Sequence, residues 1–246
     1  MIIGSKIIFI SDLTSTNTYA IRLISTERPQ EGAIIRTDFQ SAGRGQPGNK
    51  WVSERGKNLL FSIILYPQMI KPVEQFTVSM AISLGIHDFL SRKVTGCSIK
   101  WPNDVYVGND KIAGILIESS LMGDSIEYMV AGIGLNINQE RFTHDAFNPV
   151  ALKMITGKDY ELKDCLTELA SDLDKRYGQL TAGGLENIQD EYISKLYRFN
   201  EWNGFSDSGG RFTGRILSVT NSGRLLLEKK SGKQMQYYFK DVEFFP

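Results

Sequence analysis

Cysteine and histidine are scarce in this sequence, with two of each among 246 residues. Cys97 and Cys165 lie far apart in the chain, without the close spacing of paired metal ligands. The sequence therefore contains no cysteine-based metal motif. A reduced, cytoplasmic interior is the simplest interpretation of so few thiols.

An excess of either charge is also missing. Lysine and arginine total 28, and aspartate and glutamate total 28, which leaves a formal net charge of +0 and a pI of about 6.8. The chain lacks the basic field that drives non-specific binding to nucleic acids, and it has no basic stripe with interleaved aromatic residues. We therefore expect no DNA partner.

Long hydrophobic runs are absent as well. No apolar run approaches the roughly 20 residues that span a bilayer. Residues 1–12 lack the cationic segment, the long apolar segment and the small-residue cleavage site of a signal peptide. We expect no membrane partner. Hydrophobic residues nonetheless make up 41% of the chain, which is enough for a sizeable core.

The periodicity of apolar residues predicts a mixture of strands and helices. Strands are predicted at 5–10, 32–37, 58–67 and 126–138, with a hairpin around the turn Gly108-Asn109-Asp110. Helices are predicted at 17–26 and 73–93, and as a pair within 161–199. In the tail, three short strands (211–219, 223–230 and 234–245) joined by glycine turns predict a small barrel of about 45 residues.

Residues 40–58 form a glycine-rich segment between two predicted strands. Glycines at 43, 45 and 48 would let the backbone approach a ligand closely and turn several N–H groups toward an anion. The segment is not a P-loop, because no Gly-Lys-Ser/Thr begins a following helix. A mobile surface loop is the alternative. Trp51 favours a lid over a phosphate instead, since an aromatic ring is costly to leave in water.

Residues 100–114 concentrate two lysines, amides and carboxylates in an otherwise apolar stretch. Pro102 predicts the end of a strand, which places Asp104 at a strand end where ligands often bind. Asp104 would suit Mg²⁺ held against a polyphosphate. Hairpin pairing would return Lys111 to its neighbourhood, as a partner for a ligand carboxylate. The alternative is a charged turn in which Lys111 and Asp110 are solvated.

Two further segments contain more polar residues or glycines than their predicted secondary structure requires. Ser15-Thr16-Asn17 precedes a predicted helix, where one of the three would serve as an N-cap. The others are available to hydrogen-bond a neutral polar group such as a ureido group. Gly132 and Gly134, followed by Asn136, interrupt a predicted strand, and glycine in a strand often marks close approach by a ligand or another backbone.

Together these segments resemble the catalytic domain of biotin protein ligases. The matching motifs are STN at 15–17, QSAGRGQPGNKW at 40–51, KWPND at 100–104, KIAGILIE at 111–118 and GIGLNIN at 132–138. KWPND followed by K-x-A-G-I-L-x-E is the most specific element, and the motifs keep their order across about 130 residues. The tail from about Asn200 resembles the small SH3-like C-terminal domain of the same family.

The resemblance implies an α+β fold in which helices flank a mixed β-sheet, as in class II aminoacyl-tRNA synthetases and biotin ligases. A catalytic domain would span 1–199, and an SH3-like barrel would span 200–246. Biotin and ATP would give biotinyl-5′-AMP and pyrophosphate with the help of Mg²⁺. Biotin would then pass to a lysine of a biotin carboxyl carrier protein or domain. The resemblance also allows a homodimer, because family members can dimerise through sheet edges, but no segment of the sequence identifies an interface.

The resemblance also implies roles for individual residues. The catalytic group would be Lys111, Arg44 and Asp104, and Asp104 would also hold the metal. Biotin would contact a larger set of polar residues and glycines: Ser15, Thr16, Asn17, Gln40, Gly43, Arg44, Gly45, Gln46, Lys111, Gly114, Gly132 and Gly134. The nucleotide would contact Trp51, Lys100, Asn103 and Asn136.

The glycine-rich segment departs from the family pattern at two positions. Many bacterial members carry G-R-G-R-x-G-R-x-W, whereas Gln46 and Asn49 stand at the two later arginine positions. In the family the first of these arginines helps to retain the adenylate, and Gln46 carries no charge. We hypothesise that Lys50 partly compensates.

The position of the first motif is also informative. Repressor-type members carry an N-terminal winged helix-turn-helix, but the STN motif here begins at Ser15. We therefore expect a ligase without a DNA-reading module.

Two other functions compete with biotin attachment. Lipoate or octanoate attachment belongs to the same superfamily, but its members generally lack KWPND followed by K-x-A-G-I-L-x-E. A ligase-like module that binds biotin without catalysis is the other alternative. Arg44, Asp104 and Lys111 argue against it, because a simple biotin binder needs no metal carboxylate.

Overall fold

A seven-stranded mixed sheet forms the centre of the computed structural model, which describes residues 1–142 and 148–245. Its strand order is β1-β3-β5-β9-β8-β7-β6, and every pairing is antiparallel except that of β1 with β3. The strands span Ile7–Phe9 (β1), Ile34–Thr37 (β3), Leu59–Leu65 (β5), Cys97–Lys100 (β6), Asp104–Val107 (β7), Asp110–Met122 (β8) and Ser125–Leu135 (β9). Two short strands, Asp12–Leu13 (β2) and Phe39–Gln40 (β4), pair with each other in parallel.

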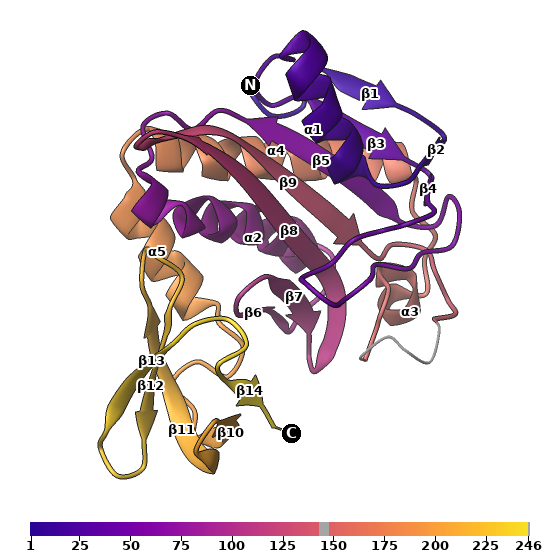
Figure 1. Cartoon of the computed structure of the whole chain (residues 1–246). Coiled ribbons are helices and arrows are strands. Elements are labelled where there is room, and N and C mark those ends of the chain that lie inside the picture. The colour runs from indigo at the N-terminus through magenta and orange to yellow at the C-terminus, as the bar shows by residue number, and fades with distance from the viewer. Residues whose placement is uncertain (143–147, 246) are drawn as a thin grey trace.

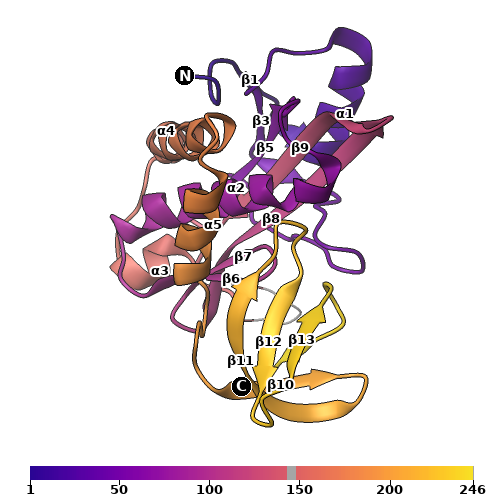
Figure 2. The ribbon, with the colours of Figure 1, turned by 90° about the vertical axis from the view of Figure 1, so that its left-hand side faces the viewer.

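Helices cover both faces of this sheet (Figures 1 and 2). Helix α1 (Thr16–Glu27) lies on one face, whereas α2 (Phe76–Ser91), α4 (Leu162–Thr181) and α5 (Leu185–Ser194) lie on the other. A 3₁₀ turn (η1, Pro72–Glu74) and the short α3 (Leu152–Thr156) complete the helices. The four predicted helices and the mixed sheet flanked by helices are therefore confirmed. No helix in the described residues is both long and apolar enough to cross a bilayer.

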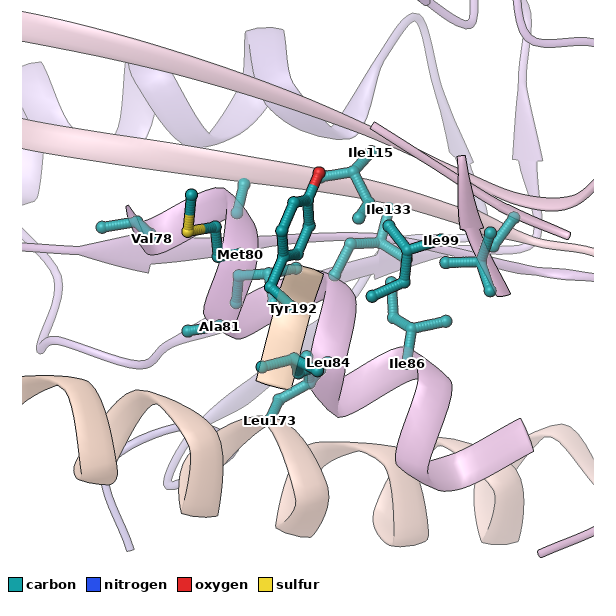
Figure 3. Close-up of a cluster of buried hydrophobic side chains, with 14 of the residues drawn as sticks. Val78, Met80, Ala81, Leu84, Ile86, Ile99, Ile115, Ile133, Leu173 and Tyr192 are labelled. Carbon is teal, nitrogen blue, oxygen red and sulfur yellow. The ribbon is translucent and has the colours of Figure 1, made fainter. Parts of the chain in front are cut away.

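Helix α2 occupies the centre of the larger hydrophobic core (Figure 3). Its side chains, Leu84 among them, pack between the sheet and the helices α4 and α5. A Cβ atom at Gly85 would fall 2.8 Å from Cδ2 and 3.0 Å from Cα of Leu173, so only glycine lets α2 and α4 approach this closely. Strand β5 is buried along its whole length, as its continuous apolar run predicts.

The tail forms a second, five-stranded antiparallel sheet in the order β13-β12-β11-β10-β14. Its strands are Asn203–Asp207 (β10), Gly210–Val219 (β11), Leu225–Lys229 (β12), Gln234–Tyr237 (β13) and Glu243–Phe244 (β14). Within the described part of the tail no pairing joins the edge strands β13 and β14, so the sheet is open and the predicted closed barrel is not confirmed. Strand β10 was not predicted, and the last predicted strand divides into β13 and β14 because the intervening residues turn.

Specific contacts seat the second sheet below the first (Figure 1). The indole Nε1 of Trp101 donates a hydrogen bond to the carbonyl of Gly223 (2.9 Å), and Arg198 donates one to the carbonyl of Phe245 (2.6 Å). Both donors lie outside the second sheet, and Trp101 directly follows β6. The second sheet is thereby held beside the segment that the sequence marks as functional.

Candidate functional site

A cavity of about 610 Å³ lies where β8 and β9 meet the N-terminal end of α1 and the glycine-rich loop after β4. Segments that are far apart in the sequence meet there. The predicted site residues that line it are Ser15, Thr16, Asn17, Gln40, Arg44, Gly45, Gln46, Trp51, Lys100, Asn103, Asp104, Lys111, Gly114, Gly132 and Gly134. Gly43 and Asn136 are not among the lining residues.

One end of the cavity is neutral and polar. The backbone N–H and the hydroxyl of Thr16 both donate to Oε1 of Gln40, at 2.8 and 3.2 Å. Ser15 occupies the N-cap position of α1 but makes no side-chain capping bond. The expectation that one of the three residues caps the helix with its side chain is therefore not met at the N-cap position, because Gln40 accepts from the first free N–H of the helix instead. Ser15, Thr16 and Asn17 line this end of the cavity.

Ser62 supports this end from below, and its role was not predicted from the sequence. Its hydroxyl lies 2.6 Å from Oδ1 of Asn17 and 2.7 Å from Oγ1 of Thr16. An amide oxygen can only accept, so the Ser62 proton points to Asn17. Ser62 is fully buried and is the one polar residue of β5. That isolated hydroxyl in an apolar strand was the available signal.

The other end of the cavity is charged. The β7–β8 hairpin returns Lys111 to Asp104, with Nζ 2.7 Å from Oδ1. The two side chains are only 29% and 20% exposed, so the alternative of a solvated Lys111 is wrong. Burial raises the pKa of the Asp104 carboxyl, and the ammonium groups of Lys111 and Lys100 oppose this rise. A carboxylate that is costly to bury is thus held next to a cation that compensates it.

Lys100 and Asn103 flank this pair. Lys100 donates to the Tyr106 hydroxyl (3.1 Å), and burial lowers the pKa of its ammonium group. The Asn103 side chain donates to the carbonyl of Ile115 (2.7 Å), and the backbone N–H of Ile115 donates back to the Asn103 carbonyl (2.9 Å). These bonds fix the segment after Pro102 against β8.

The glycine-rich loop is anchored over the cavity by Arg44. Its guanidinium donates to both carboxylate oxygens of Glu118, at 2.8 and 3.1 Å. Glu118 Oε2 also accepts from the Asn17 amide (2.9 Å). Glu118 therefore joins the loop to the neutral end. Glu118 is the last residue of the motif KIAGILIE, but no role was predicted for it.

Trp51 fills part of the cavity above two glycines. A Cβ atom at Gly134 would fall 2.3 Å from Cε2 of the indole, and one at Gly114 would fall 3.0 Å from Cζ3. A Cβ at Gly132 would fall 2.2 Å from Oδ1 of Asn17. The close approach that these glycines predict is thus made by side chains of the protein itself.

Gly43 and Asn136 act behind the cavity wall. The Gly43 carbonyl accepts from the N–H of Trp51 (3.1 Å), and a Cβ atom there would fall 2.2 Å from the Trp51 carbonyl oxygen. Asn136 donates its amide to the carbonyl of Val150 (3.0 Å) and is 3% exposed. In this structure the two residues shape the loop and the end of β9, so their predicted ligand contacts would be indirect.

Asp104 is the carboxylate of the cavity that was predicted to hold a metal ion. Within residues 1–142 and 148–245, no group of three or more His, Cys, Asp or Glu side chains could hold a metal ion. Asp104 fits the weaker requirement of Mg²⁺, which takes one or two carboxylates and completes its shell with phosphate oxygens.

Residues 9–136 match the model of the biotin/lipoate A/B protein ligase family. The chain belongs to this family. The match includes every residue that the sequence analysis placed in the site. The biotin/lipoate ligase segment thus carries both the neutral end and the charged end of the cavity.

Individual relatives of this ligase family extend the likeness to nearly the whole chain. The bifunctional ligase/repressor BirA of Bacillus subtilis is 28% identical over 248 residues, which cover 98% of this chain and 75% of the relative. The biotin–[acetyl-CoA-carboxylase] ligase of Paracoccus denitrificans is 29% identical over 232 residues, which cover 90% and 93%. The structure of the biotin protein ligase from Aquifex aeolicus in complex with biotin and ATP superimposes with a TM-score of 0.80 at 23% identity, and covers 97% and 98%. At that identity the structural likeness supports the fold alone.

The second sheet completes the cavity of this family member from outside the matched segment. The lining residues that it contributes are Phe239, Lys240, Val242, Glu243 and Phe244. None of them was predicted, because the tail was expected to form a separate barrel. No local pattern marks them, because their position depends on how the two sheets pack.

Proposed function

We propose that this protein is a biotin protein ligase that couples biotin to a lysine of a biotin carboxyl carrier protein or domain in two steps. The observation that carries the proposal is the polarity of the cavity, which places neutral hydrogen-bonding groups at one end and the Lys111–Asp104 pair at the other. Biotin has the matching chemistry, with an uncharged ureido head and a carboxylate tail. Lipoate and octanoate have apolar ends, which complement the polar groups around Thr16 and Gln40 less well.

In the first step a carboxylate oxygen of biotin would attack the α-phosphorus of ATP. A new P–O bond forms, the bond to the β-phosphate breaks, and pyrophosphate leaves. Lys111 would hold the biotin carboxylate and then the acyl-phosphate oxygens, while Arg44 and the backbone of Gly45 would cover the tail and the phosphates. Positioning and charge neutralisation carry such a reaction, without a covalent enzyme nucleophile.

Asp104 would hold Mg²⁺, which would neutralise phosphate charge when the nucleotide is bound. Its present partner is the Lys111 ammonium. We expect the ligand carboxylate to draw Lys111 away and leave Asp104 for the metal. Trp51 would lie beside the adenine.

In the second step the neutral ε-amine of the acceptor lysine would attack the acyl carbon of biotinyl-5′-AMP. An amide bond forms, AMP leaves with the electrons of the acyl–oxygen bond, and the amine releases a proton. Carrier-domain substrates are supported by the Paracoccus relative, whose name includes acetyl-CoA carboxylase.

Three further features belong to the same proposal. The division into 1–199 and 200–246, with an SH3-like fold for the second part, is supported by the separate five-stranded sheet. A homodimer would use β1, an edge strand with Ile7 and Phe9 exposed. The reaction would take place in the cytoplasm. The low cysteine count of the chain and the proposed carrier-domain substrate both suit that compartment.

The test is biotin-dependent exchange of pyrophosphate into ATP by the purified protein with Mg²⁺, comparing biotin, lipoate, octanoate and no acid. We expect exchange with biotin, followed by transfer to a purified biotin carrier domain. Exchange with lipoate or octanoate in place of biotin would show that the protein attaches lipoate or octanoate instead. Biotin binding without exchange would establish a non-catalytic module.

A further inference from the structure

Glu118 holds two parts of the cavity wall on one carboxylate. It lies on the same face of β8 as Gly114 and Leu116, because alternate residues of a strand share a face. Its Oε1 accepts from the Arg44 guanidinium (2.8 Å), and its Oε2 accepts from the same guanidinium (3.1 Å) and from the Asn17 amide (2.9 Å). The side chain is only 26% exposed, so water competes weakly for these bonds.

Asn17 is fixed against Glu118 by its other hydrogen bonds. Its N–H2 group donates to the carbonyl of Leu116 (3.1 Å) as well as to Glu118, and its Oδ1 accepts from Ser62 (2.6 Å). Both N–H groups and the amide oxygen are thus engaged, and the residue is buried. A displacement of the Glu118 carboxylate would therefore be passed to a side chain that lines the neutral end of the cavity.

Arg44 attaches the glycine-rich loop to the central sheet through the same carboxylate. A β-bridge between Arg44 and Lys50 folds this part of the loop back on itself. The second sheet holds the tip of the fold, because Nζ of Lys240 donates to the carbonyl of Pro47 (2.7 Å). Without Glu118 the base of the fold would lose its charged attachment to the central sheet.

We infer that Glu118 is a positioning residue, which makes the placement of Asn17 and the seating of the glycine-rich loop depend on each other. Glu118 is not among the described residues that line the cavity, so it acts through its two partners. A shift of either partner moves the acceptor of the other. The identification of the ligand at the Asn17 end as biotin rests on the proposed function. The alternative is a plain ion pair that holds the loop and leaves Asn17 independent of it.

Glu118→Gln tests this role, because it removes the charge and turns an N–H2 group toward the donors of Arg44 or Asn17. Tryptic cleavage after Arg44 and Lys50, located by mass spectrometry, reports how often the loop leaves its seat. Calorimetry without nucleotide gives the Kd for biotin. We expect the cleavage rate and this Kd each to rise about fivefold, with thermal unfolding close to the wild type. Glu127→Gln, which changes an exposed carboxylate of β9 outside the cavity, should match the wild type.

A double-mutant cycle separates coupling from a plain ion pair. Asn17→Ala should raise the cleavage rate about fivefold when Glu118 is present, and less than about twofold in Glu118→Gln, because the link is then already broken. This measurement needs no ligand, so it does not depend on the proposed function. If Glu118→Gln does not fold, Glu118→Asp takes its place with the same expectation, since its carboxylate is one methylene too short to reach both partners.

Two outcomes would overturn the positioning role of Glu118. Unchanged cleavage in Glu118→Gln would show that the carboxylate does not seat the loop. Equal effects of Asn17→Ala in both backgrounds would reduce Glu118 to a plain ion pair, and intact biotin-dependent exchange would then leave the proposed function standing. A non-additive cycle in a protein that does not bind biotin would support the coupling and contradict the proposed function.

Discussion

Gly134 lies directly against the indole of Trp51, so close that a Cβ atom at Gly134 would fall 2.3 Å from Cε2 of the ring. Its cross-strand neighbour Gly114 lies against the same ring. Two adjacent strands thus lack side chains where the aromatic ring rests. This pair of glycines couples the floor of the cavity to the loop that Trp51 terminates.

We predict that Gly134→Ala displaces Trp51 and raises the KM for ATP at least about tenfold, because a rigid ring cannot yield to the added methyl group. The measurement is pyrophosphate exchange at varied ATP concentration, together with thermal unfolding. Gly178→Ala in α4 is the matched control, since a Cβ atom there meets nothing within 4 Å. The control should be as active as the wild type and more stable by up to about 1 kcal/mol. Normal ATP kinetics in Gly134→Ala would separate the indole from nucleotide binding.

Ser62→Ala tests the support beneath the neutral end of the cavity. Loss of the hydroxyl leaves Asn17 Oδ1 without its donor, so we expect a several-fold rise in the KM for biotin, an unchanged KM for ATP, and a loss of about 1–3 kcal/mol of stability. Ser83→Ala is the control, because Ser83 is equally buried but its hydroxyl has no hydrogen-bond partner among the residues that the structure describes. That variant should be neutral or stabilising. Similar effects of both substitutions would point to packing and exclude a specific role for Ser62.

Lys111→Ala tests the charged end. The substitution leaves the mostly buried Asp104 carboxylate without its cation and removes the proposed charge-assisted contact to the ligand carboxylate. We expect exchange to fall at least tenfold, as the loss of about 1.5–3 kcal/mol implies, while the fold remains intact. Exchange assays and circular dichroism would be run beside Lys158→Ala, which removes an exposed lysine outside the cavity. Wild-type exchange in Lys111→Ala would remove this residue from the site.

Asp207 makes the second sheet sensitive to acid. Hydrogen bonds from Lys229 and Tyr237 lower the pKa of its carboxyl from 3.8 to about 2. The folded-state pKa is below the unfolded value, so the stabilisation is complete above about pH 4 and disappears as the pH falls through about 2. Asp207→Asn should therefore cost about 1 kcal/mol at neutral pH, a value reduced for solvent screening.

Thermal unfolding of wild type and Asp207→Asn between neutral pH and about pH 2 checks this expectation. The difference in melting temperature should close as the pH falls. Asp124→Asn is the control, because Asp124 is exposed in the β8–β9 turn and makes no ion pair within the described residues. A difference that persists at the lowest pH would show that ionisation of Asp207 is not its cause.

Local sequence patterns were sufficient to predict the part of the site that is built by pairing between two neighbouring strands. The β7–β8 hairpin returns Lys111 to Asp104 because a short turn leaves the two strands little alternative, and this closeness was predicted. The buried strand β5 and the four helices also follow from apolar periodicity over a few turns. Ser62 and Glu118 were missed because their roles depend on partners at positions 16, 17 and 44, which no pattern along β5 or β8 identifies.

The sequence by itself determined the family motifs, the secondary structure around them, and the residue types that a polar, charged cavity needs. Only the tertiary structure decided how the second sheet closes that cavity. Lys240 and Pro47 are separated by 193 positions, and their contact depends on the bonds from Trp101 and Arg198 that seat one sheet against the other. The physical reason is that periodicity and turn chemistry act over a few residues, whereas the docking of two sheets depends on packing across the whole chain.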